Sequence, residues 1–222
     1  ASFPVPGFEV QVLGSDHERL SAEEEGDVVI RLPLPPGCMS TVWGDHQRYL
    51  DAYMEQHPGY YHTGDGGYFD ADGYLYIMGR TDDVINVAGH RLSTGEMEEI
   101  VAAHPAIAEC AVVGIEDRDK GQLPVGLLIL KDGVQLSAAQ LEAELVAMVR
   151  QAIGAFANFK QTVVVSRLPK TRSGKILRQI IRKIADDKPF DPPATIDDPS
   201  VLVEIREALM TAGIGQMAET QG

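Results

Sequence analysis

The sequence Gly79-Arg80-Thr81-Asp82-Asp83-Val84-Ile85-Asn86-Val87-Ala88-Gly89-His90-Arg91 separates two parts of the chain that differ in pattern. Short β-type segments broken by Gly and Pro precede it, and amphipathic helical segments alternating with apolar strands follow it. Charged residues here lie beside backbone that bends readily, because Asp tolerates unusual backbone angles and Gly89 has no Cβ. The stretch is therefore either a hinge between two lobes or an ordinary hairpin with residues 86–89 as its turn.

The part before this stretch, residues 1–81, predicts a small β-rich lobe with one helix. Residues 8–13 alternate apolar and polar side chains with the period of a half-buried strand. Residues 28–32 form a second strand, and residues 45–56 a helix that stops at His57-Pro58-Gly59. Residues 68–78 read as a hairpin.

The part after the division, residues 82–222, predicts an α/β domain with a three-stranded sheet flanked by helices. The three strands are two apolar runs, 110–115 and 125–130, and the segment 162–165. Capping boxes at 93–96 and 137–140 open two helices. Two more helices follow from the i, i+3, i+4, i+7 spacing of 177–184 and from the capping signal before 200–209. The fold class of the whole chain is α+β.

The charge distribution limits the kinds of partner that the chain can bind. A net charge of −14 over 222 residues argues against nucleic acid as the main partner, because phosphate binding needs neutralising cations. Ten of the 19 Lys and Arg nevertheless fall between Arg150 and Lys188, where the only acids are Asp186 and Asp187. This segment indicates either a localised anionic ligand or a solvated helix face.

The cysteines and the apolar runs point to a soluble protein in a reducing compartment. Cys38 and Cys110 stand far apart, without the spacing of a zinc site or a disulfide framework. No apolar run approaches membrane-spanning length, and the N-terminus lacks a basic region followed by an apolar one. We therefore expect a cytoplasmic protein with no membrane partner.

Two motifs carry most of the possible chemistry. In Thr63-Gly64-Asp65 a carboxylate lies beside glycine, and it can accept hydrogen bonds from the two hydroxyls of a ribose or simply belong to a turn. Arg80 could reach the same ribose, a phosphate or a surface acid.

The second motif is the polar loop Pro169-Lys170-Thr171-Arg172-Ser173-Gly174-Lys175. It precedes a helix whose N-terminal amides favour anions. It is not a P-loop, because that pattern requires glycine where Pro169 stands. Arg150 lies on the outer face of its own helix. Each basic feature by itself could be a plain solvated surface.

Taken together and in order, the motifs at 61–65, 79–91 and 168–175 resemble the closing motifs of the adenylate-forming acyl-CoA synthetases. The likeness spans nearly the whole chain and is greatest to the short-chain acetyl- and propionyl-CoA synthetases, with residues 29–37 leaning toward the propionyl type. The resemblance implies an AMP-forming acid–thiol ligase. Such enzymes use ATP and Mg²⁺ to convert a short-chain carboxylate to acyl-AMP and then transfer the acyl group to coenzyme A.

The resemblance also implies roles for particular residues. Asp65, Arg80 and Arg91 would bind the nucleotide, and Lys175 would be the catalytic residue of adenylation. Asp82 would be the hinge about which the C-terminal domain rotates between the two steps.

Further implied roles concern coenzyme A, magnesium and regulation. Ala88 and Gly89 would line the pantetheine tunnel, and Arg150 would contact the phosphorylated end of coenzyme A. The positions matching Ala102, His104 and Ile107 hold Mg²⁺ in related enzymes. A lysine acyltransferase and deacylase acting on Lys175 would be regulatory partners, because acylation removes its charge.

The family's phosphate-binding loop and adenine-binding motif lie upstream of Tyr60 and are not found in residues 1–59. We therefore expect a C-terminal portion that needs an upstream N-terminal domain and is inactive alone. Two other interpretations stay open: an adenylate-forming relative that delivers the acyl group elsewhere, such as an amino-acid-activating or luciferase-like enzyme, and a non-catalytic module that binds through its basic segment.

Overall fold

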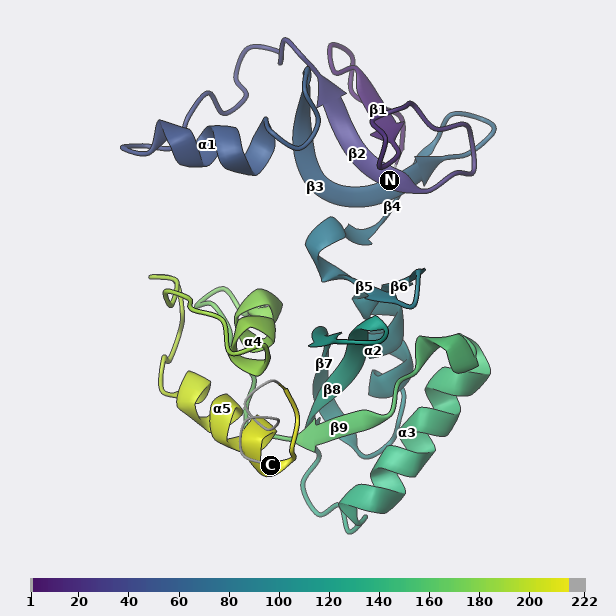
Figure 1. Cartoon of the computed structure of the whole chain (residues 1–222), viewed down its shortest axis with the longest axis vertical. Coiled ribbons are helices and arrows are strands. Elements are labelled where there is room, and N and C mark those ends of the chain that lie inside the picture. The colour runs from purple at the N-terminus through teal and green to yellow at the C-terminus, as the bar shows by residue number, and fades with distance from the viewer. Residues whose placement is uncertain (1, 216–222) are drawn as a thin grey trace. The chain divides into compact units, whose positions relative to one another are not determined.

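The computed structural model describes residues 2–215, with only the backbone described for Asp82 (Figure 1). The chain divides between Asp82 and Asp83 into two compact units, Ala1–Asp82 (unit 1) and Asp83–Gly222 (unit 2). The sequence-based division lay between residues 81 and 82. The last seven residues of the predicted second domain lie outside the described part.

Unit 1 is an antiparallel four-stranded sheet with one helix. Its strands lie in the order β1 (Val10–Leu13), β2 (Gly26–Arg31), β3 (Tyr60–Phe69) and β4 (Leu75–Arg80). Helix α1 (His46–Tyr53) begins where the Asp45 side chain accepts a hydrogen bond from Arg48 N, and it packs against β3. The short 3₁₀ turn η1 (Thr81–Asp83) follows β4 at the division between the units.

Unit 2 is built on a sheet of five strands, with β8 (Gly121–Leu130) in the middle. One edge of β8 pairs antiparallel with β7 (Ile107–Asp117), and the other pairs in parallel with β9 (Gln161–Val164). The hairpin of β5 (Val84–Val87) and β6 (His90–Ser93) joins that second edge where Val87 pairs with Gly121.

The predicted three-stranded sheet is therefore wrong in strand number. The three expected strands are present as β7, β8 and β9, but the hairpin adds two more. Local pattern identified this segment as a possible hairpin. Its membership in the sheet depends on the long-range pairing of Val87 with Gly121, which local pattern does not report.

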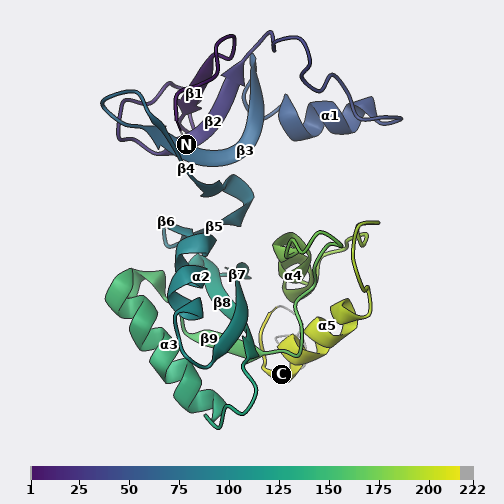
Figure 2. The same cartoon turned by 180° about the vertical axis from the view of Figure 1, so that it is seen from behind.

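Helices cover both faces of the sheet (Figures 1 and 2). On one face, α4 (Arg178–Ala185) and α5 (Val201–Thr211) bury Val113 and Leu127. On the other face, α2 (Thr94–Ala102) and α3 (Ala138–Ala152) bury Val112 and Leu128. Neighbouring strand residues point to opposite faces, so a strand buried on both faces is apolar throughout. This explains the continuous apolar runs in the sequence.

The predicted starts of α2 and α3 are confirmed by their caps, whereas the N-cap residue of α5, Ser200, makes no side-chain cap hydrogen bond. Ser137 and Gln140 form the full reciprocal capping box of α3. At α2 the Ser93 side chain accepts a hydrogen bond from Glu96 N at 3.3 Å. A short 3₁₀ turn, η2 (Ala155–Ala157), follows α3.

Among the described helices, none has both the length and the apolar character needed to cross a membrane.

Candidate functional site

In unit 1 the structure brings Asp65 and Arg80 together on neighbouring strands. The two residues are register partners of β3 and β4, and Arg80 Nη1 lies 3.2 Å from Asp65 Oδ1. The same nitrogen donates to the carbonyl of Thr63 at 2.9 Å. Both side chains are partly exposed, so an approaching ligand can meet the carboxylate and the guanidinium side by side.

The backbone around Asp65 leaves room for this arrangement. A Cβ added to Gly64, whose φ is +76°, would lie 2.3 Å from Arg80 Nη2. Thr63 Oγ1 donates to Val28 O at 2.7 Å and accepts from Asp65 N at 3.1 Å. The positive φ of residue 64 favours glycine, and a side chain there would also displace the Arg80 guanidinium; Thr63 holds the irregular part of β3 that presents Asp65.

In unit 2, Ala88 and Gly89 form the two-residue turn of the β5–β6 hairpin. Both have positive φ, +47° and +87°, and Val87 pairs with His90 on either side. These angles are those of a type I′ turn, whose twist matches that of the two strands. A Cβ on Gly89 would meet no atom within 4 Å, so the turn leaves open space beside its backbone.

Arg91 and Arg150 lie at the same end of unit 2 as this turn. Arg91 is exposed on β6, opposite Asn86. Arg150 is exposed in the last turn of α3, directly before η2, and η2 packs against β6. The contact between η2 and β6 includes the rings of His90 and Phe156, whose centroids are 4.7 Å apart.

Sequence reasoning missed the role of η2 in this arrangement. Gly154, with φ +121°, starts the turn, and an added Cβ there would lie 2.7 Å from the Phe156 ring. The pair Gly154 and Phe156 thus sets where the end of α3 meets the hairpin. The sequence offered only an isolated glycine after a helix as a signal.

Lys175 is carried on a tight turn before α4. Gly174 N donates to Thr171 O at 2.8 Å, and Lys175 N donates to Thr171 Oγ1 at 3.1 Å. Gly174 has φ +84°, a conformation that glycine adopts without strain. The Lys175 side chain is exposed, and no ion pair to it is found within residues 2–215.

The Lys175 turn and the Ala88–Gly89 turn lie toward opposite ends of the sheet. In the strand order β6-β5-β8-β7 the hairpin is at the β6 end. The Lys175 loop is tied to the β7 end, where Lys170 Nζ donates to Glu109 at 2.7 Å. In both Figure 1 and Figure 2, β7 lies between α4 and the β5–β6 hairpin. Unit 2 therefore carries the two candidate sites on separate surfaces.

Internal ion pairs occupy much of the basic segment between Arg150 and Lys188. Arg178 pairs with Glu98, and Arg167 pairs with Glu204 and Asp198. Within the described residues no ion pair is found for Arg150, as for Lys175. Three further cations of the segment form ion pairs: Lys170 with Glu109, Arg182 with Asp186, and Lys188 with Glu116. Arg150 and Lys175, the two predicted functional cations of this segment, are thus among those that remain open to a ligand.

The residues expected to hold Mg²⁺ lie at the end of α2 and the start of β7. His104 is buried, its Nε2 is 2.8 Å from Glu144, and its Nδ1 accepts from Ala106 N at 3.2 Å. Because both ring nitrogens are used, the imidazole does not fit a metal. Only the main-chain carbonyls of Ala102, His104 and Ile107 suit a hard cation. The described residues contain no group of three or more His, Cys, Asp or Glu that could hold a metal.

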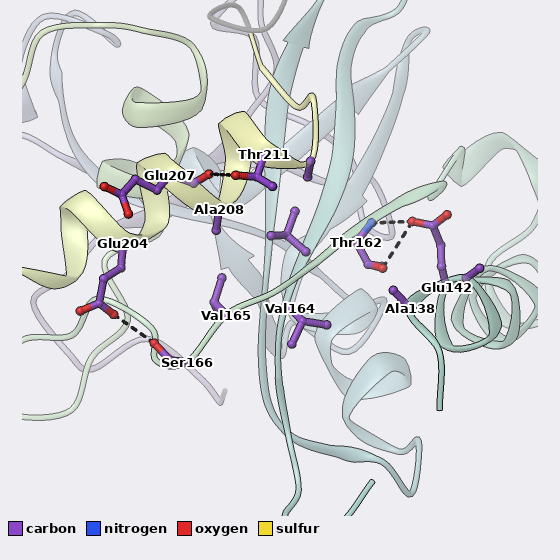
Figure 3. A pocket seen from close by; sticks show the side chains of 13 residues that line it. Ala138, Glu142, Thr162, Val164, Val165, Ser166, Glu204, Glu207, Ala208 and Thr211 are labelled. Atoms are coloured by element: carbon purple, nitrogen blue, oxygen red, sulfur yellow. Dashed lines mark hydrogen bonds between the residues drawn. The ribbon is translucent and has the colours of Figure 1, made fainter. Parts of the chain in front are cut away.

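A pocket of about 800 Å³ lies between α3, β9 and α5 (Figure 3). Glu142 on α3 accepts from Thr162 N at 3.1 Å, and Glu204 on α5 accepts from Ser166 Oγ at 3.0 Å. The described residues that line it include none of the predicted site residues. The pocket is therefore separate from both candidate surfaces.

Comparison with known proteins gives the family context. The sequence profile of the AMP-binding enzyme C-terminal domain matches residues 96–175. An uncharacterized protein of Pseudomonas aeruginosa is 62% identical over 95% of this chain and 34% of its own length. The mitochondrial acyl-CoA synthetase short-chain family member B of Dictyostelium discoideum is 48% identical, over 91% of this chain and 29% of its own length.

A solved structure shares the fold of the whole chain. The acetoacetyl-CoA synthetase of Streptomyces lividans superposes with a TM-score of 0.81 at 24% identity, covering 100% of this chain and 32% of that protein. This chain spans about a third of the length of the curated relatives that it matches. The chain carries the C-terminal domain of the AMP-binding enzymes and is similar over nearly its whole length to acyl-CoA synthetases.

Proposed function

We propose that this chain is the C-terminal part of an enzyme that converts a short-chain carboxylate, propionate or acetate, to its coenzyme A thioester. In the first half-reaction the carboxylate attacks the α-phosphate of ATP, giving acyl-AMP and pyrophosphate. In the second, the thiol of coenzyme A displaces AMP. The similarity to acyl-CoA synthetases supports the reaction class, and the Dictyostelium relative, a short-chain family member, supports the short-chain substrate.

The observation that carries the proposal is the separation of two functional surfaces in unit 2. The exposed ammonium of Lys175 is tied to the β7 end of the sheet, while the open Ala88–Gly89 turn lies at the β6 end. Two surfaces of one mobile domain suit two half-reactions that use one pocket in turn. Asp82, at the division between the units, is the proposed hinge.

The nucleotide contacts follow from the exposed charges. Asp65 binds the ribose hydroxyls, helped by Arg80, which already lies beside it. Arg91 contacts the nucleotide phosphate after rotation. Lys175 stabilises the negative charge that develops on the carboxylate and phosphate during adenylation.

Coenzyme A is held at the hairpin end of unit 2. The pantetheine chain passes along Ala88 and Gly89, where the absence of a side chain leaves space. Arg150 binds a phosphate at the nucleotide end of coenzyme A, because its planar guanidinium grips phosphate oxygens.

Magnesium and regulation complete the proposal. The carbonyls of Ala102, His104 and Ile107 would hold Mg²⁺, which supplies positive charge where bound. Acylation of Lys175 by a lysine acyltransferase, reversed by a deacylase, would switch off adenylation.

We place the enzyme in the cytoplasm. Unit 1 is the β-rich end of the large adenylation domain, and unit 2 is the mobile domain. The complete reaction needs the rest of the large domain.

The test uses a fusion in which this chain replaces the matching third of the P. aeruginosa relative. Adenylation is followed by pyrophosphate release with acetate and with propionate, and thioester formation by conversion of supplied acyl-AMP and coenzyme A. We expect Lys175→Ala to lose adenylation by a factor of about 100 or more while keeping thioester formation. Gly89→Leu should keep adenylation and lose thioester formation, because its side chain fills the pantetheine path.

Arg172→Gln is the matched control, an exposed cation on the same loop, and both its half-reactions should stay within about twofold of the parent. Equal loss of both half-reactions in Lys175→Ala and Gly89→Leu would contradict the proposal. So would robust pyrophosphate release by the 222-residue chain alone.

A further inference from the structure

The start of α4 is fastened to the rest of unit 2 by one arginine. Arg178, the first residue of the helix, donates from Nε to Glu98 Oε1 at 2.8 Å and from Nη2 to Glu98 Oε2 at 2.6 Å. Such a two-point pairing fixes orientation as well as distance. Both side chains are largely buried, with 23% and 15% of their surface exposed, so water screens the pair less than a surface pair.

Glu98 is itself held by the edge strand β7 of the sheet. Its Oε1 also accepts a hydrogen bond from Val112 N, in the middle of β7, at 2.8 Å. Glu98 belongs to α2, so one carboxylate joins α2, β7 and α4.

The loop that carries Lys175 is closed at its base directly before Arg178. Leu177 N donates to Pro169 O at 2.9 Å, and Lys170 forms an isolated bridge with Ile176. The first side of the loop is held by Lys170 and Glu109, and the second side by Arg178. Lys175 therefore projects from a short loop with two anchored ends.

The N-cap position of α4, Leu177, contributes no side-chain hydrogen bond of its own. The pairing with Glu98 raises the pKa of Arg178, and the carboxylate of Asp83 contributes to the same effect. Asp83 belongs to η1, beside the division between the units. The carboxylates of Glu98 and Asp83 thus both favour the charged form of Arg178.

We propose that Arg178 is a positioning residue for Lys175. Held by Glu98, it fixes the start of α4 and thereby the turn that presents the Lys175 ammonium. The inference rests on the proposed role of Lys175 in adenylation. Arg178 acts through the loop and need not touch a substrate.

The first test measures amide hydrogen exchange on the 222-residue chain itself. In Arg178→Gln and Glu98→Gln the amides of Gly174 and Lys175 should exchange at least about tenfold faster, because their hydrogen bonds to Thr171 depend on the anchored loop. Amides of α3 should exchange as in the parent, which separates a local loosening from a general loss of stability. Unchanged exchange in the loop overturns the inference.

The second test measures the two half-reactions in the fusion. Arg178→Gln and Glu98→Gln should each lower adenylation by about tenfold to a hundredfold, since small displacements of a catalytic group are costly. Thioester formation from supplied acyl-AMP should stay within about threefold. Arg178→Lys keeps the charge but not the fork, so its adenylation rate should lie between the parent and Arg178→Gln. The double variant should be no slower than the slower single variant, because the two residues act as one unit.

Arg182→Gln is the matched control, one turn later on the same helix, with an ion pair of 3.6 Å to Asp186. Both its half-reactions should be unchanged within about twofold. Equal loss of both half-reactions in Arg178→Gln, or no loss of adenylation, overturns the inference. If Lys175→Ala itself keeps adenylation, the proposed function fails. If only Arg178→Gln keeps it, the positioning role alone fails.

Discussion

At the scale of single residues, the function of this chain depends on which charges are paired and which are open. The sequence contains a cluster of cations, but their positions along the chain do not distinguish structural from functional ones. In the fold, Arg178 and Arg167 are held by internal carboxylates, whereas Lys175 carries no ion pair within the described residues. A cation without an internal partner, such as Lys175, is the kind that is available to bind a ligand.

One surface cluster, formed by Arg167, Asp198 and Glu204, should make stability depend on pH. Asp198 accepts hydrogen bonds from Ser200 N and from Arg167, and together these lower its pKa from 3.8 to about 2. A carboxyl group with a lowered folded-state pKa stabilises the fold above its ordinary pKa, and the contribution is lost as the pH falls through the folded value. Asp198 should thus stabilise the chain above pH 3.8 and cease to do so near pH 2.

We expect the urea midpoint of the parent chain to fall between pH 4 and pH 2 by more than that of Asp198→Asn. The variant has no titrating group at this position, so the difference between the two chains should be largest above about pH 4. Asp132→Asn, an exposed turn variant without contact to Arg167, is the control and should follow the parent. Parallel curves for the parent and Asp198→Asn would contradict the assignment.

At the scale of elements, the β5–β6 hairpin depends on one turn. Its residues adopt positive φ, so the turn imposes a backbone requirement that is independent of any ligand. The added Cβ of a Gly89 variant would meet no atom within 4 Å, so its cost is conformational rather than steric.

Gly89→Ala should therefore lower the free energy of unfolding of the chain by about 1 kcal/mol. Gly89→Asn should lose less, because asparagine tolerates the left-handed conformation. Urea unfolding of the 222-residue chain measures both. Gly95→Ala, in the first turn of α2, is a control of opposite sign and should raise stability by up to about 1 kcal/mol. Equal effects of alanine at positions 89 and 95 would refute this account.

At the scale of the whole molecule, each unit has its own internal structure. Unit 2 encloses two buried clusters, one on each face of its sheet. A domain with its own core can fold by itself. This independence is what the proposed rotation of unit 2 requires.

We expect residues 83–222, expressed alone, to unfold in one cooperative transition and to give the far-UV circular dichroism of a mixed α/β domain. The reason is that the sheet and both of its helical layers lie within this segment. Thermal and urea unfolding, followed by two spectroscopic probes, should coincide. Transitions that do not coincide, or a spectrum without helix, would show that unit 2 needs unit 1 in order to fold.

The sequence by itself determined the kinds of elements and the family. The spacing of Ser137 and Gln140 predicted the start of α3, and apolar runs predicted β7 and β8. Both predictions were possible because capping and burial patterns involve only a few neighbouring residues. The three closing motifs identified the family before any coordinates, and the comparisons confirmed it.

Only the tertiary structure decided how those elements combine. The pairing of Val87 with Gly121 made a five-stranded sheet out of an expected three-stranded one. Burial of His104 between Glu144 and Ala106 removed its ring from consideration as a metal ligand. Such contacts join residues far apart in sequence, and their energies depend on packing and burial that no local pattern reports. For the same reason, the tie between Arg178 and Glu98 became visible only in the folded chain.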